Sequence, residues 1–235
     1  MLIKNIGQYK FIGEESEDLL LYFSTANGEL NFNKNTSEGI KNLKNIKEWF
    51  NADNVGYLNQ THSNIIVNYD GKIHEGDAII TNSKLVAIGV FTADCVPIVM
   101  FDKNKKVIAA VHSGWKGTYN FIVSKVIKNM MDKYSIKSED IIVYVGPHIG
   151  KCCYKVGEDL LNNFKNVDIY GEDVTHIDKL DLTACIKKQC LNSYILEENI
   201  HILDLCTFCD EKNQWFSYRK SKTSNRMFSF IMLKK

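Results

Sequence analysis

The stretch LVAIGVFTADCVPIVMF, residues 85–101, joins two apolar strand patterns through a short polar interruption. LVAIGVFT and VPIVMF are rich in the β-branched and aromatic residues that are typical of strands. Between them lie Asp94 and Cys95, where a buried strand would be expected to place apolar side chains. The interruption therefore predicts that this end of the sheet carries a chemical function as well as part of the core.

The segments on either side continue the strand pattern. Short runs rich in Val and Ile predict strands over 64–69, 77–81, 107–112, 141–146, 201–205 and 227–233. Apolar residues at helical spacing predict helices over 36–50, 118–134, 157–165 and 181–195. Asn35 is expected to cap the first helix, with Glu38 reaching back to it. Because several strands precede the long helix, the order favours an α+β fold over a regular βαβ alternation.

The composition is typical of a globular protein that buries a sizeable core. Hydrophobic residues make up 45% of the 235 residues, and 29 Lys+Arg against 28 Asp+Glu leave a formal charge of +1. No overall field therefore favours nucleic acid or a membrane surface as a partner. Neither a membrane-spanning run nor a secretory signal pattern is found. We expect one domain over 1–235, located in the cytoplasm, with its seven irregularly spaced cysteines reduced.

Polar, reactive residues recur at the edges of the predicted strands. His62 precedes one strand, Cys95 interrupts another and His112 ends a third. Taken singly, such a histidine is usually only hydrogen-bonded, and a free cysteine is usually a small hydrophobe. Taken together, one thiolate and two imidazoles make a plausible zinc set with the fourth position open to water.

The other cysteines are expected to be structural. Cys185 and Cys190 fill apolar positions of a helical pattern. Cys206 and Cys209 form a single C-x-x-C, which is incomplete for structural zinc without a second pair. Adjacent Cys152 and Cys153 should point in different directions in regular structure. We therefore expect no second metal site, and no loss of zinc when Cys206 and Cys209 are replaced together by Ser.

Longer motifs resemble a known family. The chain carries Q-x-H before a strand, then T-A-D-C-x-P, A-x-x-H-x-G-W-x-G-T and G-P-x-I-x-x-C-C-Y-x-V, and closes with F-S-Y-R and an Arg before the last strand. Together these resemble the YfiH family, also called laccase-domain or purine nucleoside phosphorylase-type proteins. The resemblance runs from about residue 22 to the end of the chain.

The resemblance implies both a fold and an activity. The implied fold is α+β, with a β-sandwich-like mixed-sheet core wrapped by helices, shared with a group of toxin deamidases. His62, Cys95 and His112 match the family's zinc ligands. The implied substrates are purine nucleosides and phosphate, through phosphorolysis of adenosine, inosine or methylthioadenosine and through deamination of adenosine. Copper-dependent oxidation of polyphenols has also been ascribed to relatives, so copper is a possible substitute for zinc.

Some positions need separate comment. Phosphorolysis requires a cation beside the ribose, for which Lys116, Arg219 and Arg226 are candidates, although each also suits a solvated surface. Asp94 is expected to orient a neighbour of the metal. His148 lies in a family motif but is assigned no ligand role. The chain departs from the family at Ala26, in place of Arg, and at Asn225, in place of Gly, and a change at the pocket rim is expected there.

Three other functions stay open. A metal-free cysteine hydrolase or deamidase would use Cys95 as nucleophile and His112 as base. A copper oxidase of the multicopper kind is disfavoured, because six histidines without a His-x-His pair are too few for a blue site and a trinuclear cluster. A structural zinc in a partner-binding domain would require a fourth protein ligand. The expected assembly is a monomer or a homodimer.

Overall fold

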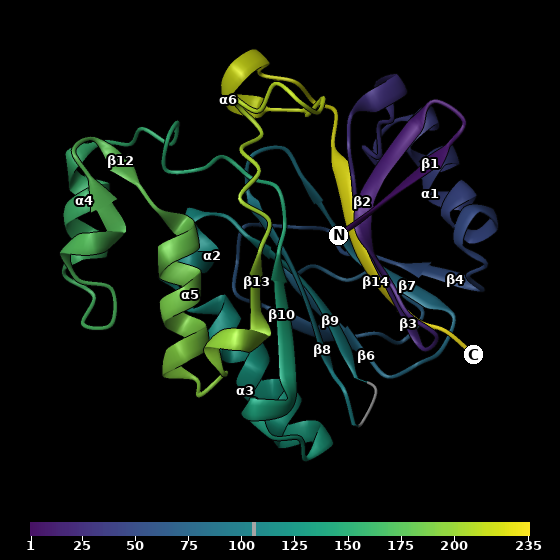
Figure 1. Ribbon diagram of the computed structural model, residues 1–235, viewed down its shortest axis with the longest axis horizontal. Helices are drawn as coiled ribbons and strands as arrows, with labels where there is room; N and C mark the ends of the chain where they lie inside the picture. The colour runs from purple at the N-terminus through teal and green to yellow at the C-terminus, as the bar shows by residue number, and fades with distance from the viewer. Residues whose placement is uncertain (105–106) are drawn as a thin grey trace.

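Strands β7 (Val86–Thr92) and β14 (Met227–Leu233) are buried along their whole length because both faces of their sheet are covered. The computed structural model describes residues 1–104 and 107–235 and contains two mixed six-stranded sheets (Figure 1). The first sheet has the order β1 (Leu2–Ile6), β2 (Tyr9–Glu15), β3 (Leu19–Ser24), β14, β7, β4 (Asn54–Gly56). The second has the order β13 (Ile200–Ile202), β10 (Ile141–Val145), β8 (Val96–Asp102), β9 (Ile108–Ser113), β6 (Ala78–Thr81), β5 (Ile66–Asn68).

Three apolar layers hold the structure together. Between the two sheets, residues such as Phe23, Val90 and Ile108 form one fully buried cluster. The outer face of the first sheet is covered by helix α1 (Ser37–Phe50) through Ile46 and Phe50. The outer face of the second sheet is covered by helices α3 (Ile122–Tyr134) and α5 (Leu182–Asn192) (Figure 1). The shorter helix α4 (Glu158–Lys165) lies farther out, beyond α5, and extends the same apolar cluster through Leu161 and Phe164. The expected α+β sandwich wrapped by helices is confirmed.

Short elements complete the chain. They are helices α2 (Trp115–Tyr119) and α6 (Tyr218–Ser221) and a small hairpin of β11 (Thr175–His176) and β12 (Lys179–Leu180). No helix in the described part of the chain has both the length and the apolar character needed to cross a membrane.

The predicted helix over 118–134 is interrupted in the structure. Phe121 adopts the left-handed conformation, with φ 60°, between α2 and α3. The carbonyl of Thr118 accepts hydrogen bonds from the Tyr170 hydroxyl and the Gln189 amide, each at 2.8 Å. Side chains distant in sequence thus occupy the acceptor that a continuous helix would use, and the helix restarts one turn later.

Two other expectations about local structure were wrong. Thr36, rather than Asn35, caps α1, because its hydroxyl accepts the N–H of Gly39 at 3.0 Å. Ile40, one of the apolar residues whose helical spacing predicted this helix, is 43% exposed instead of buried. The strands β1 to β4 were not predicted. β1, β2 and β4 are short or mix polar with apolar residues. β3 (LLLYFS) is an apolar run that the strand pattern could have identified.

Candidate active site

Cys95 and His112 lie close together because β8 and β9 are antiparallel neighbours. In their register Pro97 lies opposite His112, so the chain just before β8 adjoins the end of β9. Residues 93–95 form the sharp connection from β7, and Asp94 has φ 91°, a conformation that non-glycine residues rarely adopt. The polar interruption in the sequence is thus the turn that carries Cys95 to the sheet edge.

The loop bearing His62 is held by Asp77, which begins the chain segment leading into β6. The carboxylate of Asp77 is completely buried and accepts the backbone N–H groups of Thr61, His62 and Ser63 at 3.2, 3.1 and 2.6 Å. The Ser63 hydroxyl donates to it as well, at 2.7 Å. His62 has φ 57° in this tight loop. One buried carboxylate thereby fixes the backbone from which the first histidine projects.

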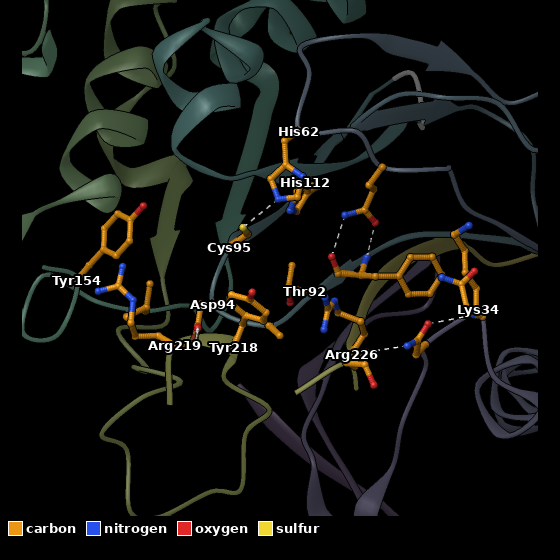
Figure 2. A pocket seen from close by; sticks show the side chains of 17 residues that line it. Lys34, His62, Thr92, Asp94, Cys95, His112, Tyr154, Tyr218, Arg219 and Arg226 are labelled. Atoms are coloured by element: carbon orange, nitrogen blue, oxygen red, sulfur yellow. Dashed lines mark hydrogen bonds between the residues drawn. The ribbon is translucent and has the colours of Figure 1, made fainter. Parts of the chain in front are cut away.

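Gln60 attaches the same loop to the first sheet. Its side-chain amide accepts the N–H of Phe91 at 2.7 Å and donates to the Phe91 carbonyl at 2.8 Å. The side chain therefore imitates a strand neighbour of β7. This explains the Q-x-H spacing: glutamine anchors the loop, and the histidine two residues later faces the site (Figure 2).

Asp77 also orients His112. Its Oδ1 lies 2.7 Å from Nδ1 of His112, and both side chains are buried. Burial would raise the pKa of the Asp77 carboxyl, but the hydrogen bonds from His112 and Ser63 hold it well below its usual range. The carboxylate therefore accepts a hydrogen bond from Nδ1–H of His112. This leaves Nε2 as the ring nitrogen that can bind a metal or another ligand.

The three side chains form a compact donor group. Nε2 of His62 lies 3.9 Å from Sγ of Cys95, and the donor atoms of His62, Cys95 and His112 all lie within 4.8 Å of one another. The two imidazole rings meet edge to face, with centroids 4.8 Å apart. A Cβ at Gly114 would lie 3.1 Å from the Cys95 sulfur, so glycine leaves the space that the cluster needs.

Cys95 and His112 shift each other's pKa in opposite directions. Burial would raise the pKa of the Cys95 thiol, but the charge of His112 and hydrogen bonds from both histidines lower it to about 6. Burial would lower the pKa of His112, but the Cys95 thiolate and the Asp77 carboxylate raise it to about 9. Without a metal, the pair therefore favours a thiolate and an imidazolium at neutral pH.

The donor group opens into a cavity of about 580 Å³. Figure 2 shows its wall, with His62, Cys95 and His112 at one side and Tyr154, Tyr218, Arg219 and Arg226 around the rest. This volume lies in the range of small-molecule sites, which is about 300–1,000 Å³. The cavity can therefore hold an organic ligand in contact with the three donors.

The cationic residues at the cavity differ from those expected from sequence. Arg219 and Arg226 line it, as does Lys34, which was not predicted. Lys116 is absent from the described lining residues: it is exposed on α2, with its ammonium 5.6 Å from the centroid of the Trp115 ring. Lys116 therefore does not face the cavity, whereas Lys34 is a third cation among the described lining residues.

Asp94 contacts the C-terminal segment rather than a donor of the cluster. Its Oδ1 accepts the Thr207 hydroxyl at 2.7 Å, and its Oδ2 accepts the N–H of Arg219 at 2.6 Å. It therefore positions the start of α6 and the cavity wall. The expectation that Asp94 supports a zinc ligand was wrong, because the carboxylate on His112 belongs to Asp77.

A family model described as multi-copper polyphenol oxidoreductase laccase matches residues 19–234, nearly the whole chain. The chain belongs to this family. Among known structures, the crystal structure of the Bacillus licheniformis hypothetical protein YfiH is similar with a TM-score of 0.88 over 99% of both chains, at 24% identity. The Neisseria meningitidis protein NMB0706 has a TM-score of 0.83 at 23% identity, covering 96% of this chain and 99% of that one. These structural likenesses confirm the fold, and the family match confirms the resemblance that the sequence motifs indicated.

Curated relatives of this laccase family carry another name. A protein of Clostridium acetobutylicum named purine nucleoside phosphorylase is 49% identical over 100% of both chains. A mouse protein named purine nucleoside phosphorylase LACC1 is 30% identical over 84% of this chain and 47% of that protein. The family description names an oxidoreductase, whereas these relatives are named for phosphorolysis.

Neither of the two departures from the laccase-family pattern is among the described residues that line the cavity. Ala26 is buried, and its N–H donates to the carbonyl of Gln214 at 2.8 Å. Asn225 lies between two lining residues, and its carbonyl accepts Nη1 of Arg226 at 2.8 Å. Any influence of these positions on the rim is thus indirect, through the backbone.

His148 is buried with both ring nitrogens hydrogen-bonded, to the Gly146 carbonyl and the Thr183 hydroxyl.

A second group of side chains that could bind a metal lies outside this site. The sulfurs of Cys152, Cys153, Cys206 and Cys209 lie within 4.8 Å of one another. The expectation that the adjacent cysteines could not join the C-x-x-C was wrong, because both lie in an irregular turn, where the opposed directions of regular structure do not apply.

Proposed function

We propose that this chain is a zinc-dependent purine nucleoside enzyme that phosphorolyses adenosine, inosine or methylthioadenosine and deaminates adenosine. The carrying observation is the group of His62, Cys95 and His112 at the wall of a nucleoside-sized cavity. The relative named purine nucleoside phosphorylase, 49% identical over the whole chain, supports the same substrate class. With its seven cysteines free, the protein would act in the reducing cytoplasm, as a monomer or homodimer.

The donor set fits zinc. A tetrahedral zinc with Zn–S near 2.3 Å and Zn–N near 2.05 Å places sulfur and nitrogen roughly 3.6 Å apart, and the observed separation of Cys95 and His62 is 3.9 Å. In the described chain the cluster includes no fourth side chain, and its open side faces the cavity. When bound, zinc would supply Lewis acidity to a reacting group in the cavity. An open position favours a catalytic site over the structural-zinc alternative.

The remaining residues would bind and orient the substrate. Tyr154 and Tyr218 offer aromatic faces for a purine base. The guanidinium carbon of Arg219 lies 5.3 Å from the centroid of the Tyr154 ring, and its Nη1 donates to the Lys155 carbonyl at 2.8 Å. Together with Arg226 it presents positive charge where an anion such as phosphate would bind. Asp77 keeps the Nδ1 proton on His112 and so preserves the donor at Nε2.

Metal content and product analysis test this proposal. Purified protein should contain zinc, and chelation should remove zinc and turnover together. Inosine should give free base only when phosphate is present, whereas adenosine should give inosine without phosphate. Activity that persists in a metal-free protein would contradict the zinc mechanism.

Loss of an arginine should affect phosphorolysis selectively. Arg219→Gln and Arg226→Gln, made separately, should each raise the KM for phosphate by roughly 10–100-fold, the value of one charge-assisted hydrogen bond. Deamination of adenosine, which needs no phosphate, should change much less. Lys116→Gln serves as the matched control, since it removes a cation that does not line the cavity. Equal losses of phosphorolysis and deamination would show that the arginines bind the nucleoside or stabilise the fold and do not bind phosphate.

A metal-free cysteine hydrolase remains the second candidate because of one observation. Cys95, His112 and Asp77 form a nucleophile–base–carboxylate series, and the thiol has a pKa of about 6. The multicopper alternative is less well supported. The metal-binding groups found in the described residues contain two histidines between them, whereas a blue site and a trinuclear cluster need more. A single copper in place of zinc would give at most weak oxidase activity.

A further inference from the structure

Four cysteines from two separate turns meet about a common centre. Cys152 and Cys153 lie in the turn that follows β10, and Cys206 and Cys209 lie in the turn that follows β13. Because β10 and β13 are parallel neighbours, both turns leave the same end of the sheet. Backbone hydrogen bonds join the two segments: His148 donates to the Leu205 carbonyl at 3.1 Å, and Thr207 donates to the His148 carbonyl at 2.9 Å.

The sulfur spacing matches a metal site. Four sulfurs around a tetrahedral zinc, each about 2.3 Å from the ion, lie roughly 3.8 Å apart. The sulfurs of Cys152 and Cys209 are 3.5 Å apart, and all four sulfurs lie within 4.8 Å of one another. A disulfide would require a separation of about 2.0 Å.

The burial of these cysteines is unlike that of core residues. Cys152 and Cys209 are exposed, and Cys153 and Cys206 are half-buried. In contrast, Cys185 and Cys190 are fully buried in the main apolar cluster. Thiols that served only as small hydrophobes would lie in the core, as that second pair does.

Backbone N–H groups converge on the Cys206 sulfur. The N–H of Gly150 donates to this sulfur at 3.3 Å, and the N–H groups of Phe208 and Cys209 also donate to it. Such hydrogen bonds orient the sulfur as a ligand.

We propose that Cys152, Cys153, Cys206 and Cys209 bind a second zinc ion in a closed, structural site. Four thiolates in a tetrahedral arrangement suit zinc and leave no open position for substrate. The site is independent of the proposed catalytic zinc at His62, Cys95 and His112.

The location gives this second zinc a role in shaping the cavity. Thr207 lies next to Cys206 and donates to Asp94, which in turn accepts the N–H of Arg219. Tyr154 follows Cys153 directly and lines the cavity beside Arg219. A metal that fixes both turns would therefore fix two parts of the cavity wall.

Zinc analysis of the full chain tests the proposal. Wild-type protein, purified under reducing conditions with zinc present, should contain about two zinc ions per chain. Cys206→Ser with Cys209→Ser should retain one, Cys95→Ala should retain one, and the triple variant should retain none. Cys185→Ala with Cys190→Ala is the matched control, because it removes two cysteines from the core; it should keep both ions.

A second measurement does not depend on the folding of the Cys206 and Cys209 variants. The Cys95→Ala protein, stripped of metal, should bind one equivalent of Co²⁺ with the strong thiolate-to-metal absorption of a four-sulfur site. The proposal is overturned if this protein binds no Co²⁺, if the wild type holds a single zinc that only Cys95→Ala removes, or if iron occupies the site. A count of fewer than seven free thiols in denatured, metal-free wild-type protein would instead show a disulfide.

Discussion

Cys95→Ala is expected to abolish zinc binding at the triad and nucleoside turnover together. The variant removes the only thiolate of the donor group and leaves two imidazoles. Loss of a residue that hydrogen-bonds to a metal ligand already costs roughly 10–100-fold in metal affinity or activity, and loss of the ligand itself should cost more. The measurements are zinc stoichiometry, corrected for the four-cysteine site, and product release from adenosine and inosine.

Cys95→Asp separates a ligand from a nucleophile. Aspartate keeps an anionic donor that zinc accepts, so part of the zinc and part of the turnover should return when zinc is supplied in excess. A nucleophilic Cys95 would make the aspartate variant as inactive as the alanine variant, because a carboxylate cannot replace the thiolate in its role.

The two histidines provide a further comparison. His62→Ala and His112→Ala should both resemble Cys95→Ala, since each leaves two ligands. A cysteine hydrolase predicts that His62→Ala is much milder than His112→Ala, because only His112 would act as base. If all of these variants kept wild-type zinc at the triad, the proposed metal site would be refuted.

Asp77→Ala is expected to lower both metal affinity and stability strongly. The carboxylate is buried, accepts three consecutive backbone N–H groups and holds Nδ1 of His112. Removing one partner of a buried ion pair costs about 3–5 kcal/mol. Metal affinity should fall by a further ~10–100-fold, because His112 would lose its orientation. The readouts are the free energy of unfolding in denaturant and a zinc competition titration.

Two variants sharpen this result. Asp77→Asn keeps the shape but replaces an acceptor by an amide donor, so it should keep more stability than Asp77→Ala while still weakening zinc. Asp70→Asn is the matched control, because it breaks an exposed pair with His74 at 3.0 Å, where solvent screens the charges. Near-wild-type zinc affinity in Asp77→Asn would show that Asp77 only anchors the loop of His62, and that its negative charge does not affect metal binding by His112.

The local pattern of apolar residues predicted the central strands of the fold but missed several of the outer ones. The strands within 77–101 and 107–112 were predicted because their apolar runs are long enough to be recognised without context. The strands β1 and β2 were missed, since their polar residues are compatible with loops until β3 pairs with β2 and with β14. β3 was missed as well, although its run LLLYFS is as apolar as the strands that were predicted. The break at Phe121 was missed for a similar reason, because Tyr170 and Gln189 reach Thr118 from more than 50 residues away.

The sequence by itself predicted the α+β class and, through its family motifs, the candidate ligands His62, Cys95 and His112, because residue type and strand-edge position are local properties. Only the tertiary structure decided which carboxylate supports the site: Asp77, at the start of an apolar strand, rather than Asp94, next to Cys95. Only the tertiary structure showed that Lys34, and not Lys116, lines the cavity. It also showed that four cysteines from two distant turns lie together. The physical reason is that hydrogen bonds and metal geometry depend on the distances between atoms, and for distant residues these distances are set by sheet register and strand order.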